Sequence, residues 1–419
     1  MRTGFYRENA PWLATALLLT FGSSFGQTFF ISLFAGGIRA EFGLSDGAWG
    51  GIYTLATLAS AAVLVQLGRL ADSVGLLTLT IGVGLGYLTA IALTALAPTV
   101  WLLGLGVFGL RLCGQGMMGH LAMTAIARWF AANRGRAVAV AVLGYPLGEA
   151  LLPPVAVLVI SAVGWRAGWG LAAGMLALLI LPAIVLLLAR GRRVPRGEGT
   201  ESGAPGMDGR HWTRRAVLAH WSFWALMPGV LAPAFIGTVV FFHQVHVSEV
   251  RGWSLVAMAA GYPVYAGVSV AVSLLTGALV DRYGPVRLLP GYLLPMTVAI
   301  AALALEGGVG VWLAVLLGIG VSQGLVVTIL GALWPTLYGT RHIGSVKAVA
   351  MAAMVVSTAI GPGITGLFID LGYPLPVQGP AMALWCLAAS ALFVGLVPRL
   401  QRRLPAGNGL GTGAPAAGR

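Results

Sequence analysis

Charged residues are scarce in this chain of 419 residues. They make up 9% of it, whereas about 25% is typical of soluble domains, and 58% of the residues are hydrophobic. This composition argues against a soluble globular protein and indicates an integral membrane protein. A net charge of +13 would suit a nucleic-acid partner only if the basic residues shared one solvated face. They lie instead at the ends of apolar runs, so we expect no nucleic acid partner and a lipid bilayer around the chain.

Cysteine is nearly absent, and motifs for covalent or metal chemistry are lacking. The two cysteines, Cys113 and Cys386, both lie in apolar runs, so neither a disulfide framework nor a metal site is expected. No His, Asp, Glu or Cys spacing suggests a metal, and no phosphate-binding loop or nucleophile triad occurs. We therefore expect a protein that is not an enzyme, has no cofactor and uses ion or solute gradients rather than ATP.

Apolar runs long enough to cross a bilayer recur along the chain. The first begins after a basic N-terminus but continues past Phe30 without a cleavage pattern, so it reads as a span rather than a signal peptide. The twelve predicted spans are 11–36, 47–67, 76–97, 99–127, 137–163, 167–189, 220–245, 253–276, 286–305, 309–335, 345–369 and 379–397.

The distribution of basic residues predicts the orientation. With the N-terminus inside, the segments on the outer side hold only Arg39, Arg166 and Arg251, and Arg111 lies within a span. All other Lys and Arg residues then fall on the inner side, as the positive-inside rule requires. We therefore expect both termini in the cytoplasm and a location in the bacterial inner membrane.

The region between the sixth and seventh spans differs in composition. Residues 190–219 are rich in Gly, Pro and charge, which is typical of a flexible cytoplasmic linker. The prediction is an N-terminal six-helix bundle (1–189), this linker, a C-terminal six-helix bundle (220–398) and a disordered cytoplasmic tail (399–419).

The two predicted bundles share a repeated loop. GRLADSVG at 68–75 and GALVDRYG at 277–284 both follow the second span of their bundle, and the same separation of 209 relates Gly135 to Gly344. Two copies with the same membrane orientation indicate parallel repeats related by an axis along the membrane normal.

These loops resemble the signature of the major facilitator superfamily, Gly-x-x-x-Asp-Arg/Lys-x-Gly followed by basic residues. The resemblance covers residues 10 to 397 and implies an all-α polytopic membrane protein with twelve transmembrane helices in two pseudo-symmetric halves. It further implies a cytoplasmic gate formed by Gly68, Asp72, Gly75, Gly277, Asp281, Arg282 and Gly284. The first copy departs from the signature at Ser73, where a basic residue is usual.

Other stretches resemble bacterial relatives of the monocarboxylate and oxalate/formate transporters. They are RWFAANRGRAVAVAVLG, HWSFWALMPG, LYGTRHIGSVKA and STAIGPGITGLFID. Such carriers often pair their substrate with an arginine in span eight, but span eight has no charge here. The resemblance alone therefore does not assign a carboxylate cargo.

Two charged residues lie near the middle of the membrane. Arg111 in span four and Glu149 in span five reach a similar depth, and an arginine there costs at least about 2.5–3.5 kcal/mol on insertion scales. A site for cargo and protons is the favoured interpretation. A fixed structural clamp between the two helices, or side chains that face different ways, are the alternatives.

Polar residues accompany these charges. Gln115 and Tyr145 lie four residues from Arg111 and Glu149, on the same helical faces. Ser24, Gln27 and Thr28 form a stripe in span one that either lines a cavity or makes interhelical hydrogen bonds. Gln323 is close to the repeat-mate of Gln115 in span ten. The predicted substrate-binding set is Arg111, Gln115, Ser24, Gln27, Thr28, Tyr145 and Gln323.

Two further groups have less specific patterns. Tyr262, Tyr265 and Trp334 either wall a cavity or, as we favour, pack in the core or anchor at the interface. His243 and His246 lie near the outer end of span seven. They either sense external pH or, as we expect, are simply solvated.

The leading hypothesis is secondary active transport of a small organic anion by alternating access, as a proton symporter or by exchange for a counter-anion. Arg111 would pair with the cargo, and Glu149 would carry the proton and pair with Arg111 when no cargo is bound. A proton-driven efflux antiporter for amphipathic compounds is the alternative. A membrane sensor without transport activity is a minor one.

Overall fold

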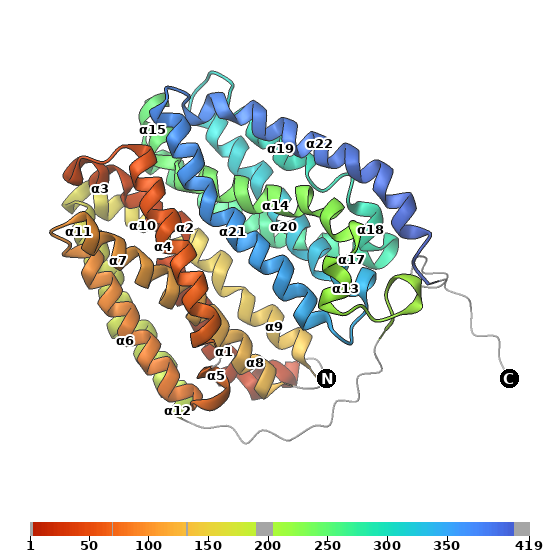
Figure 1. The fold of residues 1–419 in the computed structure, drawn as a ribbon. Helices are drawn as coiled ribbons and strands as arrows, with labels where there is room; N and C mark the ends of the chain where they lie inside the picture. The colour runs from red at the N-terminus through yellow and green to blue at the C-terminus, as the bar shows by residue number, and fades with distance from the viewer. Residues whose placement is uncertain (1–2, 69, 131–132, 190–203, 406–419) are drawn as a thin grey trace. The chain divides into compact units, whose positions relative to one another are not determined.

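The computed structural model describes residues 3–68, 70–130, 133–189 and 204–405. Every regular element within these ranges is helical (Figure 1). A bilayer offers the backbone no hydrogen-bond partners, so spans of this composition satisfy their amides internally as helices. Residues 190–203 of the predicted linker and most of the tail (406–419) lie outside the described residues.

The first predicted span is broken. α1 (Thr3–Gly22) and the short helix η1 (Ser23–Gly26) are followed by Gln27 in an extended conformation, with φ −82° and ψ 155°. The chain continues through α2 (Thr28–Ile31), η2 (Ser32–Phe34) and α3 (Ala35–Phe42), and the two parts of the span meet at 43°. The break at Gln27 leaves backbone groups of span one free to bind side chains of other helices.

The remaining spans of the N-terminal half are long helices, two of which contain π-helical stretches. They are α4 (Asp46–Leu67), α6 (Leu76–Ala95), α7–η3–α8 (Val100–Gly109, Leu110–Met118, Gly119–Trp129), α9–α10 (Arg134–Val142, Gly144–Val163) and α11–η4–α12 (Trp165–Gly174, Met175–Ile180, Leu181–Ala189). The loop after α4 carries the short helix α5 (Leu70–Ser73).

The C-terminal half begins after η5 (Met207–Gly209) and α13 (Arg214–Leu218). Its helices are α14 (Trp221–Phe242), α15 (Gln244–Arg251), α16 (Leu255–Ala259), α17 (Tyr262–Tyr283), α18 (Pro285–Leu288), α19 (Leu294–Ala302), α20 (Gly310–Tyr338), α21 (Ile343–Asp370) and α22 (Leu375–Gln401).

Among the described residues, ten helices are long and apolar enough to cross a membrane, and the bent first pair makes an eleventh span. The remaining predicted span, 286–305, is interrupted: α18 and α19 are separated by turns at 289–293. Pro290 and Gly291 lie in these turns and explain the interruption, because proline lacks the backbone N–H that continues a helix; Pro295 follows in the first turn of α19, where proline is tolerated. The twelve-span arrangement holds, although two spans are discontinuous.

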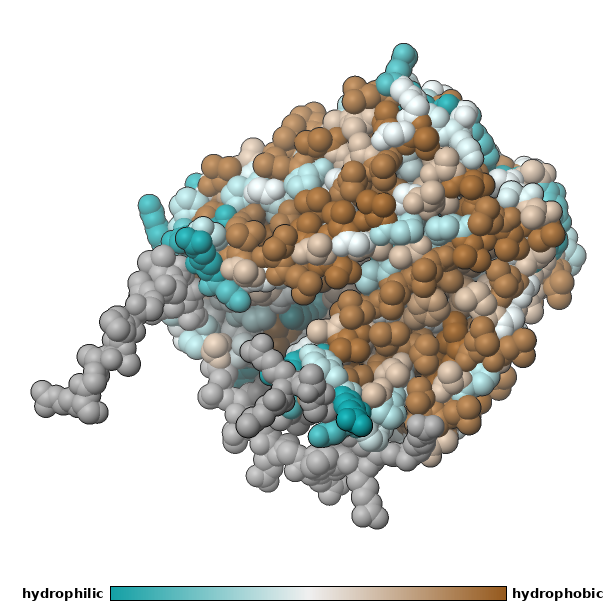
Figure 2. Space-filling view, turned by 180° about the vertical axis from the view of Figure 1, so that it is seen from behind, coloured by the Kyte–Doolittle hydropathy of each residue, from teal (hydrophilic) through white to brown (hydrophobic). Residues whose placement is uncertain are grey.

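The outer surface of the helices is apolar. Figure 2 shows hydrophobic residues over most of the face seen there, with hydrophilic residues gathered toward its margins. Large apolar side chains such as those of Leu178 and Leu274 are 76% and 75% exposed. Apolar surface on this scale has a bilayer as its solvent, and the chain is an integral membrane protein.

Two compact units make up the chain. The first comprises Met1–Gly199, Thr238–Ala266 and Thr358–Leu375, so it contains the N-terminal half, all of α15 and α16, and one end each of α14, α17 and α21. The second comprises Thr200–Gly237, Gly267–Ser357 and Pro376–Arg419. These units do not coincide with the predicted six-helix bundles, which remain a prediction.

Candidate functional site

Arg111 lies in the π-helical stretch η3 of span four, within the first unit. Its side chain is 1% exposed, and it is among the largest fully buried side chains of the described residues. π-helical turns within α-helices are rare and often mark functional sites. The sequence-based placement of an arginine inside the membrane is therefore matched by a local helical distortion.

Two groups hold one side of the Arg111 guanidinium. Nη1 donates a hydrogen bond to the Gly26 carbonyl oxygen at 3.0 Å. The guanidinium carbon lies 5.1 Å from the centroid of the Tyr53 ring, a cation–π distance. The Tyr53 hydroxyl is in turn 2.6 Å from the Thr28 hydroxyl.

The other side of the guanidinium is unpaired. Among the residues that the structure describes, neither Nε nor Nη2 of Arg111 has a hydrogen-bond partner. Buried polar groups are nearly always hydrogen-bonded, and leaving a charged one unsatisfied is costly. Nε–H and the neighbouring Nη2–H form one edge of the guanidinium fork, which fits a carboxylate in bidentate fashion.

Glycine at position 26 makes this arrangement possible. A Cβ atom there would lie 2.2 Å from the Leu110 carbonyl oxygen and 2.9 Å from the Gln115 backbone nitrogen. The broken part of span one therefore packs directly against the backbone of η3. Gln115 and Gln27 are both partly exposed near this contact, and within the described ranges neither side chain has a hydrogen-bond partner.

Glu149 does not pair with Arg111 in this structure. No ion pair within 4.0 Å joins the two side chains, and in the described chain the Glu149 carboxylate has no hydrogen-bond partner. Glu149 instead lies within electrostatic reach of Tyr262 and Tyr265. Similar depth in the membrane does not fix the direction of a side chain around its helix axis, and the expected Arg–Glu pair is not formed in this structure.

The other predicted substrate-binding residues differ in their surroundings, and the structure does not bring all of them together at Arg111. Ser24 is fully buried, and its hydroxyl has no partner among the described residues. A Cβ on Gly148 would lie 2.0 Å from that hydroxyl, so spans one and five are in close contact there. Tyr145 is partly exposed, with its hydroxyl packed against Gly119. Gln323 is partly exposed on α20, in the second unit.

The predicted cytoplasmic gate is described in part. The Asp72 side chain lies outside the described residues, whereas the Gly68 carbonyl oxygen is 3.1 Å from His120 Nε2. In the second copy, Asp281 and Arg282 are exposed, and Arg282 lies 5.2 Å from the centroid of the Tyr283 ring. Gly284 has φ 75°, a left-handed conformation that favours glycine. Gating by these residues remains a prediction.

The aromatic residues pack as we favoured. Tyr262 and Tyr265 are buried and contact Phe241, with ring centroids 5.7 and 5.3 Å away. In the second unit, Trp334 is 4% exposed and stacks on Tyr338. Both groups are therefore core.

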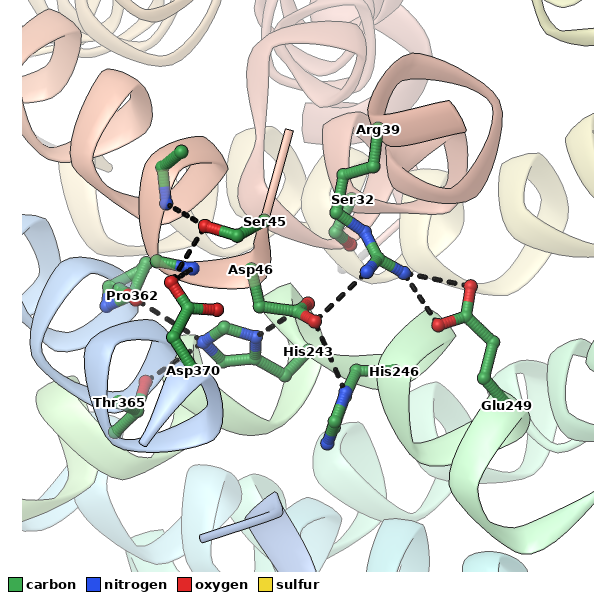
Figure 3. A network of polar contacts seen from close by, with 12 residues as sticks. Ser32, Arg39, Ser45, Asp46, His243, His246, Glu249, Pro362, Thr365 and Asp370 are labelled. Carbon is green, nitrogen blue, oxygen red and sulfur yellow. Dashed lines mark hydrogen bonds and ion pairs between the residues drawn. The ribbon is translucent and has the colours of Figure 1, made fainter. Parts of the chain in front are cut away.

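The histidines of span seven are not solvated as expected. His243 and His246 are 2% and 7% exposed, and both face Asp46 at the start of α4 (Figure 3). Their ring Nδ1 atoms lie 3.9 and 3.4 Å from the Asp46 carboxylate. The spacing of His243, His246 and Glu249 at intervals of three residues, which places them on one helical face, was the available sequence signal.

Comparisons with known proteins agree with this architecture. A family model described as Major Facilitator Superfamily matches residues 16–362. An uncharacterized 38 kDa protein in a 23S RNA operon of Thermoproteus tenax is 27% identical over 358 residues, which cover 84% of this chain and 85% of that protein.

Two solved structures share the fold. Both are crystal structures of a bacterial homolog to the human lysosomal transporter Spinster, in inward-facing conformations, one unoccupied and one occupied. The TM-scores are 0.67 and 0.65 at 18% identity. The matches cover 94% and 95% of this chain, and 95% and 97% of those chains. The family match extends over most of the chain and the solved structures have the same fold, so this chain belongs to the Major Facilitator Superfamily and is a membrane transporter rather than an enzyme.

Proposed function

We propose that the protein transports a small organic anion, such as a monocarboxylate, by alternating access. The observation that carries this proposal is the unpaired Nε–Nη2 edge of Arg111, a fully buried guanidinium. A carboxylate on that edge would satisfy both nitrogens and neutralise the charge. An anionic cargo would thus provide the hydrogen-bond acceptors that Nε and Nη2 of Arg111 lack in the folded chain.

The surroundings of Arg111 suit a small cargo. Its fixed side is closed by the Gly26 carbonyl and the Tyr53 ring. Gln115 and Gln27, whose amides are unengaged among the described residues, lie on the two segments that meet at Gly26. We propose that they complete the recognition of the carboxylate or of a polar substituent next to it.

Glu149 is the proposed proton-coupling residue. A charge without a partner is costly within a membrane, and a bound proton removes that cost. Because Glu149 and Arg111 form no ion pair in this structure, direct exchange of partners between cargo and proton has no support here. We propose coupling through the conformational change, with Glu149 protonated in the same half-cycle in which Arg111 is loaded.

A second candidate is proton-driven efflux of amphipathic compounds. The observation that favours it is the electrostatic interaction of Glu149 with Tyr262 and Tyr265, whose rings contact those of Phe29 and Phe241. These rings are packed together in this structure, and if they separated during the transport cycle they would offer cation–π contacts to a cationic, apolar cargo.

A thermal-shift screen of the purified protein separates the two candidates. A ligand that binds the native state raises its apparent stability, by about 2.7 kcal/mol at a hundredfold excess over Kd. We expect stabilisation by small carboxylates, lost in Arg111→Gln and kept in Glu149→Gln. Stabilisation by lipophilic cations, lost in Glu149→Gln, would instead support efflux and refute anion transport.

The orientation belongs to the same proposal. We infer that both termini are cytoplasmic and that the membrane is the bacterial inner membrane, because basic residues concentrate at one end of the spans. The ends that carry Asp46, His243 and Asp370 are then the outer ends.

A further inference from the structure

A polar cluster ties together four segments at these outer ends, all within the first unit. Arg39 at the end of α3 bonds to Asp46 at 2.9 Å and to both carboxylate oxygens of Glu249 at 2.6 and 2.8 Å (Figure 3). Asp370 at the end of α21 accepts hydrogen bonds from the Ser45 hydroxyl at 2.6 Å and from the Gly47 amide at 3.1 Å. Segments up to 325 residues apart therefore share one hydrogen-bonded cluster.

Next to this cluster lies the side-chain amide of Gln244, whose nitrogen and oxygen are both hydrogen-bonded. Gln244 is fully buried and donates to the Phe29 carbonyl at 3.1 Å and the Ser32 hydroxyl at 2.8 Å, and it accepts from the Tyr262 hydroxyl at 2.8 Å. Gln244, which directly follows His243 in the chain, thus joins spans one, seven and eight, and the outer ends form one packed layer.

The hydrogen bonds of His243 define its neutral form. Thr365 donates its hydroxyl proton to the Gly361 carbonyl at 2.8 Å, so its oxygen is an acceptor toward His243 Nε2 at 2.9 Å. His243 therefore carries its proton on Nε2, and Nδ1 has a lone pair directed toward Asp46 at 3.9 Å. That distance is too long for a hydrogen bond, and Nδ1 is free to take a proton.

His246 supplies a second ring in the same place. Its Nδ1 lies 3.4 Å from Asp46, and within the described chain its buried Nε2 has no hydrogen-bond partner. The groups that face the two rings are Asp46 on α4, Arg39 on α3 and, around them, Glu249 on α15 and Asp370 on α21. Two buried histidines thus lie beside the Asp46 carboxylate, and Arg39 shares its single positive charge between that carboxylate and Glu249.

We propose that Asp46, His243 and His246 form a proton-binding site, and that a proton taken up there from the outside holds the outer ends of the helices apart. This inference rests on the proposed transport function, because it assigns the site to one half of the alternating-access cycle. It is a different site from Glu149, which would carry the transported proton.

The direction of the effect follows from burial. Removal from water lowers the pKa of His243 to about 4 in the packed layer; Asp46 opposes this, while His246 and Arg39 add to it. Separation of the outer ends would hydrate the ring and return its pKa toward about 6.5. Since the open form binds the proton more tightly, falling external pH shifts the equilibrium toward the open form. Closing requires that the proton leave.

Distance measurements between spin labels test this site. Labels at Leu96→Cys and Leu371→Cys, two exposed positions near the outer ends, would be placed in a Cys113→Ala, Cys386→Ala background in nanodiscs. We expect the ratio of long to short distances to rise as pH falls below about 6.5, by up to about tenfold per pH unit for one proton. His243→Gln, which keeps a donor toward Thr365 but cannot titrate, should flatten this response.

The matched control is His342→Gln, because His342 is exposed and lies elsewhere. The control should keep the parent's response. The proposal is overturned if the distance ratio in His243→Gln responds to pH as it does in the parent. It is also overturned if the distance ratio of the parent does not change between pH 8 and pH 5, a result that does not depend on whether any histidine variant folds. Carboxylate binding that depends on Arg111 should persist in His243→Gln, so failure of the proton site is distinguishable from failure of the proposed cargo.

Discussion

Arg111 Nη1 donates a hydrogen bond to the Gly26 carbonyl oxygen at 3.0 Å, across the break in the first membrane span. This contact fixes one side of a buried guanidinium while its other edge stays unpaired among the described residues. The break in span one and the π-helical stretch in span four are thus two parts of a single site. Each depends on the close backbone contact at Gly26.

Gly26→Ala should destabilise the protein and weaken cargo binding. The added methyl group would lie 2.2 Å from the Leu110 carbonyl oxygen, and overpacking of this kind costs about 1–3 kcal/mol. Gly51→Ala is the control, because its Cβ would meet nothing within 4 Å. Thermal unfolding in detergent measures both variants, and equal unfolding temperatures would contradict the packing described for span one.

The two gate loops should contribute unequally to flux. Because the first copy has Ser73 where the second has Arg282, Asp281→Asn should reduce uptake into liposomes more than Asp72→Asn does. Normalising flux to the amount of reconstituted protein excludes differences in expression. Equal effects, or a larger effect at Asp72, would show that the missing basic residue does not weaken the first gate.

Glu149→Gln should separate exchange from accumulation. The amide imitates the protonated carboxyl, so cargo should still bind and exchange across the liposome membrane. Accumulation driven by an inward proton gradient should be lost, because the residue no longer takes up or releases a proton. Gradient-driven accumulation at the parent's level would place the transported proton at another residue.

The second unit should have a pH-dependent contact at His220. The Arg403 guanidinium lies 2.6 Å from His220 Nε2 and also pairs with Asp208 at 3.1 Å. Burial and Arg403 lower the pKa of His220, so the folded state binds this proton less tightly than the unfolded state. The contact therefore stabilises above pH about 6.5 and is lost as the pH falls below that value.

His220→Gln is the test of this contact. The unfolding temperature of the parent should fall more steeply between pH 7.5 and pH 5.5 than that of His220→Gln. His342→Gln, at an exposed histidine, should follow the parent. Identical slopes in all three proteins would show that His220 is not protonated on unfolding in this range.

The fold was largely predictable because membrane spans have a strong sequence signal. Long apolar runs, charge at their ends and the repeated loop indicated the twelve spans and the family. The interruption at Pro290 and Gly291 was visible as a proline and a glycine, but hydropathy averages over such positions. The break at Gln27 has no comparable signal, since it depends on the contact between Gly26 and η3.

The site was less predictable because it depends on the direction in which each side chain leaves its helix as well as on its depth in the membrane. Arg111 followed from its cost within the membrane, but its partners are a backbone carbonyl and an aromatic ring, which no charge pattern reveals. Glu149 was placed beside Arg111 by depth alone, and the two form no ion pair. His243 was misjudged because its acceptors come from α21, more than a hundred residues away in sequence.

Calorimetric titration of small carboxylates into parent and Arg111→Lys protein tests the central claim most directly. A lysine keeps the charge but cannot present the Nε–Nη2 edge, and hydrogen bonds to charged groups contribute about 1.5–3 kcal/mol each. We predict that affinity falls at least about tenfold in Arg111→Lys, disappears in Arg111→Gln and is unchanged in Arg399→Lys, an exposed control. Carboxylate binding at the parent's affinity in Arg111→Gln would contradict the account.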